Sequence, residues 1–292
     1  MTATTAGRVV VLSGANAGIG HGMLETLLAD GYRVAALDVD TANLGALGEQ
    51  YGQQLRVYEC DVTSDDAVDT TVADVLDAWE RVDVLVHNAG IFNFGLMRDR
   101  SLADTREEFE VNVFGAIRLV HAVLPGMRER GDGRIHLVSS GVGRVGNPGL
   151  TGYGATKGAL ESFTHSLRLE LQNEAVSCSV MQPSLARTES ALELGYPESM
   201  MEDPAVVGRK LARKVESTKP VVYADLKTRL GIRFAELFPF VVTRSTRRFL
   251  DEPPSPAAPD GTAASDDERD APDSGDQAVA EGVEDDATAA DA

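Results

Sequence analysis

The sequence predicts an α/β fold, a doubly wound parallel sheet of about seven strands with helices on both faces. Three observations support it. From residue 7 to about 225, short apolar, β-branched runs alternate with segments of helical spacing, a glycine-rich turn joins the first strand to the first helix, and polar residues directly follow several strands. Strands buried on both faces are continuous apolar runs, and connections of helical length join parallel strands.

The first strand, turn and helix form the start of a βαβ unit. The first apolar run leads into a turn in which Gly14, Gly18 and Gly20 are spaced as Gly-x-x-x-Gly-x-Gly. Apolar residues recur at helical spacing over 18–29, and residues 33–37 form the second strand. Such glycines let the backbone approach a pyrophosphate, and N–H groups at the start of a helix attract anions. We expect a dinucleotide site here; a glycine-rich turn without a ligand is the alternative.

The remaining elements continue the alternation. Helices are expected near residues 64–79, 101–130, 152–173 and 203–216, and strands near 55–60, 82–87, 133–139, 176–182 and 220–223. Ligands of such sheets bind at the carboxyl ends of the strands, near the switch in strand order. Gly14, Asp38, Asn88, Ser140 and Pro183 all follow strands, so we expect them along one edge of the sheet.

Asp38 closes the second strand, eighteen residues after Gly20. A carboxylate at this position accepts hydrogen bonds from ribose hydroxyls and repels a 2′-phosphate, so NAD is favoured over NADP. Val39 follows Asp38 and Asn16 in the turn is neutral, which leaves no obvious basic side chain to bind that phosphate. An alternative role for Asp38 is the N-cap of a helix that begins near Thr41.

Tyr153 and Lys157 are spaced to share one face of a helix, and Ser140 stands thirteen residues before the tyrosine. A neighbouring cation favours phenolate and lowers the pKa of a tyrosine, which can then act as acid or base near neutral pH. Alone the pair is weak evidence, because most such pairs are surface residues of a helix. Ser139 competes with Ser140, but neighbours on a strand point to opposite faces, and the spacing to Tyr153 favours Ser140.

Together these motifs resemble the short-chain dehydrogenase/reductase family, in its compact single-domain Rossmann form, over residues 7 to about 225. The family's landmarks occur in order: the turn glycines, Asp61-Val62 after the third strand, Asn88-Ala89-Gly90 after the fourth, Asn112, Ser139-Ser140, and Tyr153 with Lys157. Two positions depart from the pattern. Ser13 replaces a threonine and keeps the hydroxyl, and Ser184 follows Pro183 where the family usually has glycine, although Thr188 can still bind the nicotinamide amide.

The resemblance implies hydride transfer between NAD(H) and a secondary alcohol or ketone. Tyr153 would transfer the proton, Lys157 would lower the tyrosine pKa and bind the nicotinamide ribose, and Ser140 would donate to the substrate oxygen. Asn112 would hold a water that links Lys157 to solvent. Each has a structural alternative: a bend in the helix for Asn112, a strand-end cap for the serine, a solvated side chain for Lys157. The expected cofactor contacts are Gly14, Asn16, Gly18, Ile19, Gly20, Asp38, Asp61, Val62, Asn88, Ala89, Gly90, Tyr153, Lys157, Pro183 and Thr188.

Substrate identity is weakly encoded. The resemblance places a mobile lid over the substrate near residues 188–204, and its large apolar residues are Leu192, Leu194, Tyr196, Met200 and Met201. Phe92, Phe94, Leu96 and Val145 are candidates to extend that wall. This composition suits a hydrophobic steroid-, retinoid- or lipid-like substrate, the alternative being packing into the core or a subunit interface.

Three other functions are open at this point. An NADP-dependent ketone or 3-oxoacyl reductase shares the motifs but conflicts with Asp38. A non-catalytic dinucleotide-binding regulator is expected to lose Tyr153 or Lys157, and both are present. An epimerase or dehydratase of the extended branch has a different glycine spacing and a larger C-terminal region.

The chain beyond residue 225 has a different composition. Residues 226–250 are rich in Leu, Phe, Val and Arg, and Pro239 separates two predicted amphipathic helices. We favour the interpretation that these helices cover the substrate pocket or a partner subunit. The alternative is contact with an anionic membrane surface. Residues 251–292 have fourteen acidic side chains against Arg269 alone and no aromatic residue, so we expect disorder.

Composition argues against several other classes of protein. The net charge is −19, and no basic patch accompanies base-stacking aromatics, so nucleic-acid binding is not expected. Cys60 and Cys178 fall on predicted buried strands, which implies neither a disulfide framework nor a metal site. The N-terminus lacks the basic and apolar regions of a signal peptide, so we expect a cytoplasmic protein. As a separate expectation, the chain forms a homodimer or homotetramer.

Overall fold

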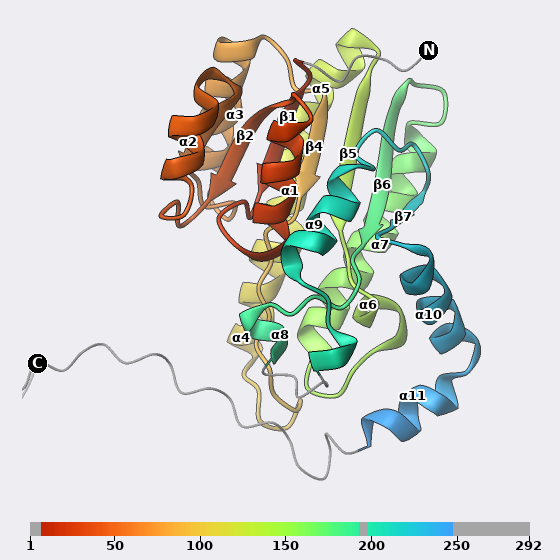
Figure 1. Cartoon of the computed structure of the whole chain (residues 1–292). Helices are drawn as coiled ribbons and strands as arrows, with labels where there is room; N and C mark the ends of the chain where they lie inside the picture. The colour runs from red at the N-terminus through yellow and green to blue at the C-terminus, as the bar shows by residue number, and fades with distance from the viewer. Residues whose placement is uncertain (1–6, 193–197, 248–292) are drawn as a thin grey trace, which may run out of the picture. The chain divides into compact units, whose positions relative to one another are not determined.

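The computed structural model describes residues 7–192 and 198–247, which form a seven-stranded parallel sheet with surrounding helices (Figure 1). The strands are β1 (Val9–Ser13), β2 (Arg33–Asp38), β3 (Leu55–Glu59), β4 (Val84–His87), β5 (Gly133–Val138), β6 (Val176–Gln182) and β7 (Val221–Tyr223). They lie in the order β3-β2-β1-β4-β5-β6-β7, and each neighbouring pair is parallel. The predicted Rossmann-type fold is therefore confirmed, and strand order reverses between β1 and β4.

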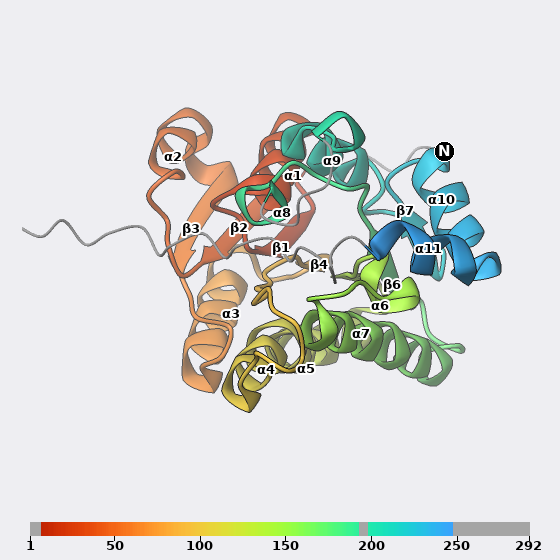
Figure 2. The ribbon, with the colours of Figure 1, turned by 90° about the horizontal axis from the view of Figure 1, so that it is seen from below.

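Helices cover both faces of the sheet (Figure 2). On one face lie α1 (Gly18–Ala29) and α9 (Pro204–Ala212), and on the other lie α3 (Asp65–Trp79), α5 (Gly115–Arg130) and α7 (Thr151–Glu170). Successive side chains of β1 divide between two cores, Val9 and Val11 packing in one and Val10 and Leu12 in the other. A strand buried on both faces needs apolar residues at every position, which explains its unbroken apolar run.

The other helical elements are short. They are α2 (Gly45–Tyr51), η1 (Gly52–Gln54), α4 (Leu102–Phe109), α6 (Val142–Val145), α8 (Glu189–Leu192), η3 (Glu198–Met200), α10 (Leu226–Leu237) and α11 (Pro239–Thr246). Side-chain caps define several of their starts: Ser101 Oγ accepts from the Asp104 N–H before α4, and Asp225 accepts from the Thr228 N–H before α10. Pro239 begins α11, so the two expected C-terminal helices are present.

The helix expected over residues 101–130 is interrupted. α4 ends at Phe109, the π-turn η2 (Glu110–Phe114) follows, and α5 begins at Gly115. Asn112 lies in this π-turn, and its amide exchanges two hydrogen bonds with the backbone of Ile91, both of 2.8 Å. π-turns inside helices are frequent at functional sites. The bend proposed as the structural alternative for Asn112 is therefore real, and it directs the side chain to the loop after β4.

The strand ends meet along one edge of the sheet. Ser13, the last residue of β1, pairs with Leu37 and His87, and Val138 at the end of β5 pairs with Met181. The loops that follow β1, β2, β4, β5 and β6 consequently open at the same edge, where the motifs were expected to converge.

Within residues 7–192 and 198–247, no helix combines the length and hydropathy that crossing a bilayer requires. Leu194 and Tyr196 of the expected lid, and the acidic segment 251–292, lie outside the described residues.

Candidate active site

The glycine turn forms a close-packed cradle before α1. Gly14 and Gly18 have φ of 69° and 59°, in the left-handed region that favours glycine. A Cβ on Gly20 would lie 1.8 Å from the Gly14 carbonyl oxygen, so a side chain there would displace the turn. The N-cap residue Ala17 makes no side-chain cap, and α1 has no acidic residue in its first turn. The first N–H groups of α1 can therefore serve an anionic ligand.

Asp38, at the end of β2, hydrogen-bonds the backbone of the glycine turn. Its Oδ2 accepts from the Asn16 backbone N–H at 2.8 Å, and Oδ1 accepts from the Asp40 N–H at 3.4 Å. The N-cap alternative is not observed, since α2 begins at Gly45. The carboxylate is half-buried, so part of it is accessible to a ligand in the turn.

Ser13 links the cradle to the loop after β4. Its Oγ accepts from the backbone N–H groups of Asn88 and Ala89, both at 3.3 Å, and lies 2.9 Å from His87 Nδ1. Asn88 in turn donates its side-chain amide to the Gly14 carbonyl at 2.9 Å. Burial lowers the pKa of His87 to about 3, so the ring is neutral and acts as a structural partner. The serine that replaces the family threonine thus retains a structural role.

The residues after β3 lie beside these loops in two different environments. Asp61 is exposed and accepts from the Thr63 N–H and hydroxyl, both at 2.8 Å. Val62 is buried, and a Cβ on Gly115 at the start of α5 would lie 2.7 Å from its Cγ2. Asp61 therefore presents a polar surface and Val62 packs into the core.

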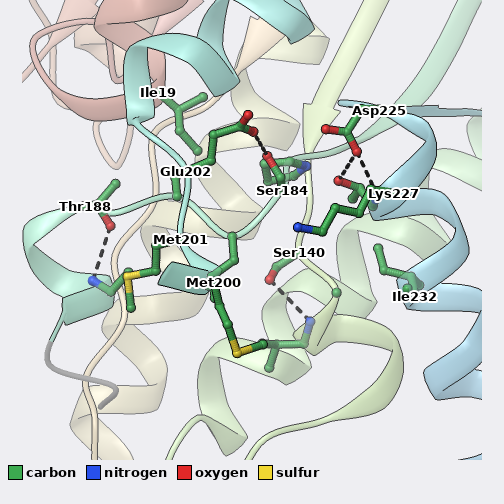
Figure 3. A pocket seen from close by; sticks show the side chains of 18 of the residues that line it. Ile19, Ser140, Ser184, Thr188, Met200, Met201, Glu202, Asp225, Lys227 and Ile232 are labelled. Carbon is green, nitrogen blue, oxygen red and sulfur yellow. Dashed lines mark hydrogen bonds between the residues drawn. The ribbon is translucent and has the colours of Figure 1, made fainter. Parts of the chain in front are cut away.

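Ser140, Tyr153 and Lys157 come together next to the cradle. Ser140 lies on the cavity wall (Figure 3) and hydrogen-bonds the Tyr153 hydroxyl. The Lys157 Nζ lies over the Tyr153 ring, 5.4 Å from its centroid, and donates to the Val138 carbonyl at 3.0 Å. Lys157 is only 3% exposed, so its charge is held within the protein and is not a solvated surface charge.

The pKa of Tyr153 differs from the sequence-based expectation. Burial, with a smaller contribution from the Glu108 carboxylate, raises the pKa of Tyr153 to about 12, and the hydrogen bond with Ser140 opposes that rise. The Lys157 ammonium, which lies over the ring and donates to the Val138 carbonyl, does not offset this rise, so the expected net lowering is not observed. Burial also lowers the pKa of Lys157 to about 8. In this structure the phenol is protonated at neutral pH.

Asn112 joins this group through a residue that the sequence analysis missed. Its Nδ2 donates to Thr156 Oγ1 at 3.0 Å, and that hydroxyl donates to the Tyr153 carbonyl at 2.7 Å. A Cβ on Gly90 would lie 3.1 Å from Asn112 Oδ1 and 3.2 Å from Lys157 Nζ, so both polar groups converge on that glycine. The available signal for Thr156 was its position between Tyr153 and Lys157 on one helix.

The two neighbouring serines occupy different environments. Ser139 is 1% exposed, and its Oγ donates to Glu161 Oε1 at 3.1 Å. Glu161 also accepts from Gln182 Nε2 at 2.6 Å and from Arg144 Nε at 2.7 Å. Ser139 therefore belongs to a buried network with α7, whereas Ser140 lines the cavity.

A buried ion pair behind Tyr153 was also missed. Arg100 donates to Glu108 Oε2 at 2.7 Å, and the side chains are 4% and 0% exposed. Glu108 Oε1 accepts from the Asn93 N–H at 2.8 Å, which ties the loop after β4 to α4. Glu108 stands one helical turn before Asn112, a spacing that places both on one face, but the sequence gives no sign of Arg100 as its partner.

A cavity of about 690 Å³ opens between these residues, the lid region and α10 (Figure 3). It is mostly apolar, and its lining includes Ile19, Phe92, Ser140, Val142, Leu150, Tyr153, Pro183, Thr188, Met200, Met201 and Ile232. Phe92 packs 5.4 Å from the Tyr153 ring, centroid to centroid. Met200, Met201 and Phe92 thus hold the places expected of a substrate wall.

Four of the expected wall residues lie elsewhere: Phe94, Leu96, Val145 and Leu192 are not among the lining residues. Phe94 packs against Gly149, whose Cβ would lie 2.4 Å from its ring, and Leu192 is 44% exposed. Val142 lines the cavity from α6 in place of Val145. Spacing alone did not reveal which face of each short element turns inward.

Polar residues form one end of the cavity. Ser184, at the position of the missing glycine, donates to Glu202 Oε2 at 2.7 Å (Figure 3). Lys210 Nζ donates to Glu202 Oε1 at 2.5 Å and to Asp225 Oδ2 at 2.7 Å. The departure from the family pattern therefore supplies a hydroxyl that links the loop after β6 to the end of the lid region.

Comparison with known proteins matches this chain to the family model described as short chain dehydrogenase, over residues 8–197. The chain belongs to the short-chain dehydrogenase family. The Danio rerio protein named dehydrogenase/reductase SDR family member 7B is 30% identical over 258 residues, which cover 81% of this chain and 84% of that protein. Human retinol dehydrogenase 8 is 38% identical over 204 residues, covering 68% of this chain and 65% of that protein. The aligned region thus spans less than two thirds of the human protein.

Solved structures of this family share the fold. A short-chain dehydrogenase from Streptomyces avermitilis superimposes with a TM-score of 0.71 at 28% identity, covering 84% of this chain and 97% of its own. A 3-ketoacyl-(acyl-carrier-protein) reductase from Brucella melitensis, solved with NADH, has a TM-score of 0.69 at 24% identity, covering 75% and 96%. This short-chain dehydrogenase thus has the dinucleotide-binding fold of an oxidoreductase family.

Proposed function

We propose that this short-chain dehydrogenase interconverts a hydrophobic secondary alcohol and its ketone with NAD(H). The observation that carries the proposal is the meeting of Ser140, Tyr153 and Lys157 on the wall of an apolar cavity, beside the glycine cradle. Each of these features is common alone, but an acid–base phenol next to a dinucleotide cradle is specific to redox chemistry on an oxygen-bearing carbon.

The cradle fits a nicotinamide dinucleotide. A Cβ on Gly14 or Gly20 would fill the space that the turn leaves, and the start of α1 offers N–H groups to a pyrophosphate. Asp38 would hold the adenosine ribose, and the exposed Asp61 with the backbone of Val62 would adjoin the adenine. The other expected contacts, from Asn16 to Thr188, would complete the site. When bound, the nicotinamide accepts or supplies the hydride.

Tyr153 would move the proton. In the reductive direction the phenol, protonated at neutral pH, gives its proton to the carbonyl oxygen as that oxygen gains negative charge. The Ser140 hydroxyl donates to the same oxygen and stabilises the developing charge. The phenolate that remains is stabilised by the buried ammonium of Lys157, whose Nζ adjoins Asn112 near Gly90. A water held by Asn112 would return the proton from solvent. Alcohol oxidation follows these steps in reverse.

Asp38 supports NAD as the preferred cofactor. Its half-buried carboxylate is bound to the turn through the Asn16 N–H, so it cannot easily move away from a 2′-phosphate. Related folds have been solved both with NADH and, in a structure titled ElxO, with NADP bound, so the fold itself accommodates either cofactor. The charge at the end of β2 therefore carries the preference.

The apolar cavity supports a hydrophobic substrate. Its wall of Phe92, Val142, Leu150 and two methionines suits a ring or chain more than a polyol. A relative named retinol dehydrogenase shares 38% identity with this chain, which agrees with a retinoid-, steroid- or lipid-like alcohol.

A screen for NADH formation tests the proposal. The purified chain is given NAD or, in a parallel series, NADP. One panel of substrates contains apolar alcohols, namely secondary steroid alcohols and the primary alcohol retinol, and the other contains small polyols. We expect kcat/KM for the best apolar alcohol to exceed that for any polyol by about a hundredfold. The reason is that several methylene groups of an apolar substrate would be buried against the cavity wall. Activity confined to polyols would reject the substrate class, and turnover with NADP only would reject the cofactor.

A further inference from the structure

The helices α10 and α11 expose a large apolar face. Leu226, Leu230, Phe234 and Leu237 are 66%, 59%, 51% and 73% exposed. Their spacing of four, four and three residues places them along one side of α10. Phe238, Phe240 and Val241 continue the exposed apolar surface into α11. Among the described residues, sixteen large apolar side chains are exposed, and these seven fall within sixteen consecutive positions, so this patch is a concentrated feature.

The opposite side of α10 is held against the catalytic region. The cavity is lined from α10 by Lys227, Thr228, Gly231 and Ile232. Figure 3 labels Lys227 and Ile232. Glu236 accepts from Arg144 of α6 at 3.0 Å. These contacts determine which side of α10 faces outward. Because α10 already packs against its own domain, the exposed apolar stripe lies on the side that does not contact that domain. Covering the pocket therefore accounts for one face of α10. It does not explain the apolar residues on the other face.

The apolar stripe has basic borders. Apart from Lys227, which lines the cavity, the basic side chains between residues 226 and 247 are Arg229, Arg233, Arg244 and Arg247, and Glu236 is the single acidic one. The whole chain by contrast has a net charge of −19. An apolar face with arginines beside it complements a surface of apolar chains beneath negative headgroups.

We propose that α10 and α11 bind peripherally to an anionic lipid surface. The apolar stripe would lie at the boundary of headgroups and acyl chains, and the arginines would contact the phosphates. The twelve residues of α10 lie flat in this arrangement, since they are too few to cross a bilayer. A second copy of this chain is the competing occupant of the face, and the sedimentation measurement below tests it.

Membrane contact would place the substrate cavity at the lipid surface. α10 forms part of the cavity wall on one side and the apolar stripe on the other, so an apolar alcohol leaving the bilayer has a short route to Ser140 and Tyr153. This consequence rests on the proposed function, but the lipid contact itself does not.

Vesicle flotation with the full-length chain tests the contact. One set of vesicles contains phosphatidylcholine alone and another contains phosphatidylcholine with phosphatidylserine. We expect recovery with the second set at low salt, and loss of binding as salt is raised. The double variant Leu230→Asp, Phe234→Asp should lower the partition coefficient by about tenfold or more, because each loses a buried apolar side chain and adds a negative charge.

The matched control carries Leu102→Asp and Leu169→Asp. Leu102 on α4 and Leu169 on α7 are 65% and 69% exposed, so this control adds the same two negative charges at similarly exposed apolar sites, and we expect unchanged flotation. A circular dichroism spectrum and a thermal unfolding midpoint that match those of the wild type verify that the double variant is folded. Absence of flotation with phosphatidylserine at low salt, or equal flotation of the double variant, would overturn the proposal. Sedimentation that shows a dimer lost in the double variant, without vesicle binding, would assign the face to a second copy.

Discussion

Replacing Ser140 and Ser139 separately by alanine should separate catalysis from stability. Ser140 faces the cavity, and removal of one donor to a developing oxyanion costs about 10²–10³ in kcat, or about 2.7–4 kcal/mol. Among the residues that the structure describes, its Oγ accepts one long bond, 3.3 Å from the Val142 N–H, besides the contact with Tyr153. Loss of that bond should change the free energy of unfolding by less than about 1 kcal/mol.

Ser139→Ala should have the opposite effect. The variant removes a buried donor 3.1 Å from Glu161 Oε1, and hydrogen bonds to charged groups contribute about 1.5–3 kcal/mol to stability. Glu161 keeps its bonds from Gln182 and Arg144, so we expect the lower end, about 1.5 kcal/mol, and kcat within about threefold of wild type.

Two assays measure this difference. Steady-state kinetics with the best alcohol gives kcat, and urea unfolding followed through the single tryptophan, Trp79, gives the free energy of unfolding. If Ser139→Ala abolished turnover at unchanged stability while Ser140→Ala remained active, the assignment of the two hydroxyls would be wrong.

Three further predictions follow from the cradle and the buried lysine. Asp38→Asn removes the charge that repels a 2′-phosphate, worth about 1–4 kcal/mol at 4 Å, so the NADPH to NADH affinity ratio should rise about tenfold or more; fluorescence titrations that give an unchanged ratio contradict this role. Ketone reduction should slow as pH rises through about 8. Burial lowers the pKa of Lys157 to about 8, so its cation is lost above that pH, while the raised pKa of Tyr153, about 12, keeps the phenol protonated. A kcat/KM profile that is flat between about pH 6 and 10 would refute this prediction. Gly20→Ala places a methyl 1.8 Å from a turn carbonyl and should weaken NADH binding by at least about tenfold, whereas Gly48→Ala, with open space around its Cβ, should bind NADH as wild type does, and equal affinities would argue against the cradle.

The sheet and the placement of the motifs were accessible to sequence reasoning because local patterns determine them. The apolar run of β1 packs on both faces, so its composition alone shows a central parallel strand. Polar residues after strands converge because parallel strands end at one edge, which placed Gly14, Asp38, Asn88 and Ser140 correctly along that edge.

Other features depend on contacts between distant residues. The raised pKa of Tyr153 arises from burial and from Glu108, and neither is visible in a Tyr-x-x-x-Lys spacing. Arg100 and Glu108 pair through packing of a loop against α4, and the π-turn at Asn112 inserts into a helix whose apolar pattern is continuous on both sides. The sequence alone does not show that one side of α10 lines the cavity while the other is exposed, because this depends on how the helix packs against the domain.

The central claim is that Tyr153 transfers the proton of an NAD-linked alcohol and ketone reaction, and Tyr153→Phe tests it most directly. The ring still packs against Phe92 while the hydroxyl is lost, so NADH affinity and unfolding should be close to wild type. We predict that kcat for NADH formation from the best apolar alcohol falls by about 10²–10⁴ at unchanged NADH affinity. A Tyr153→Phe enzyme that retains the wild-type kcat would contradict the account.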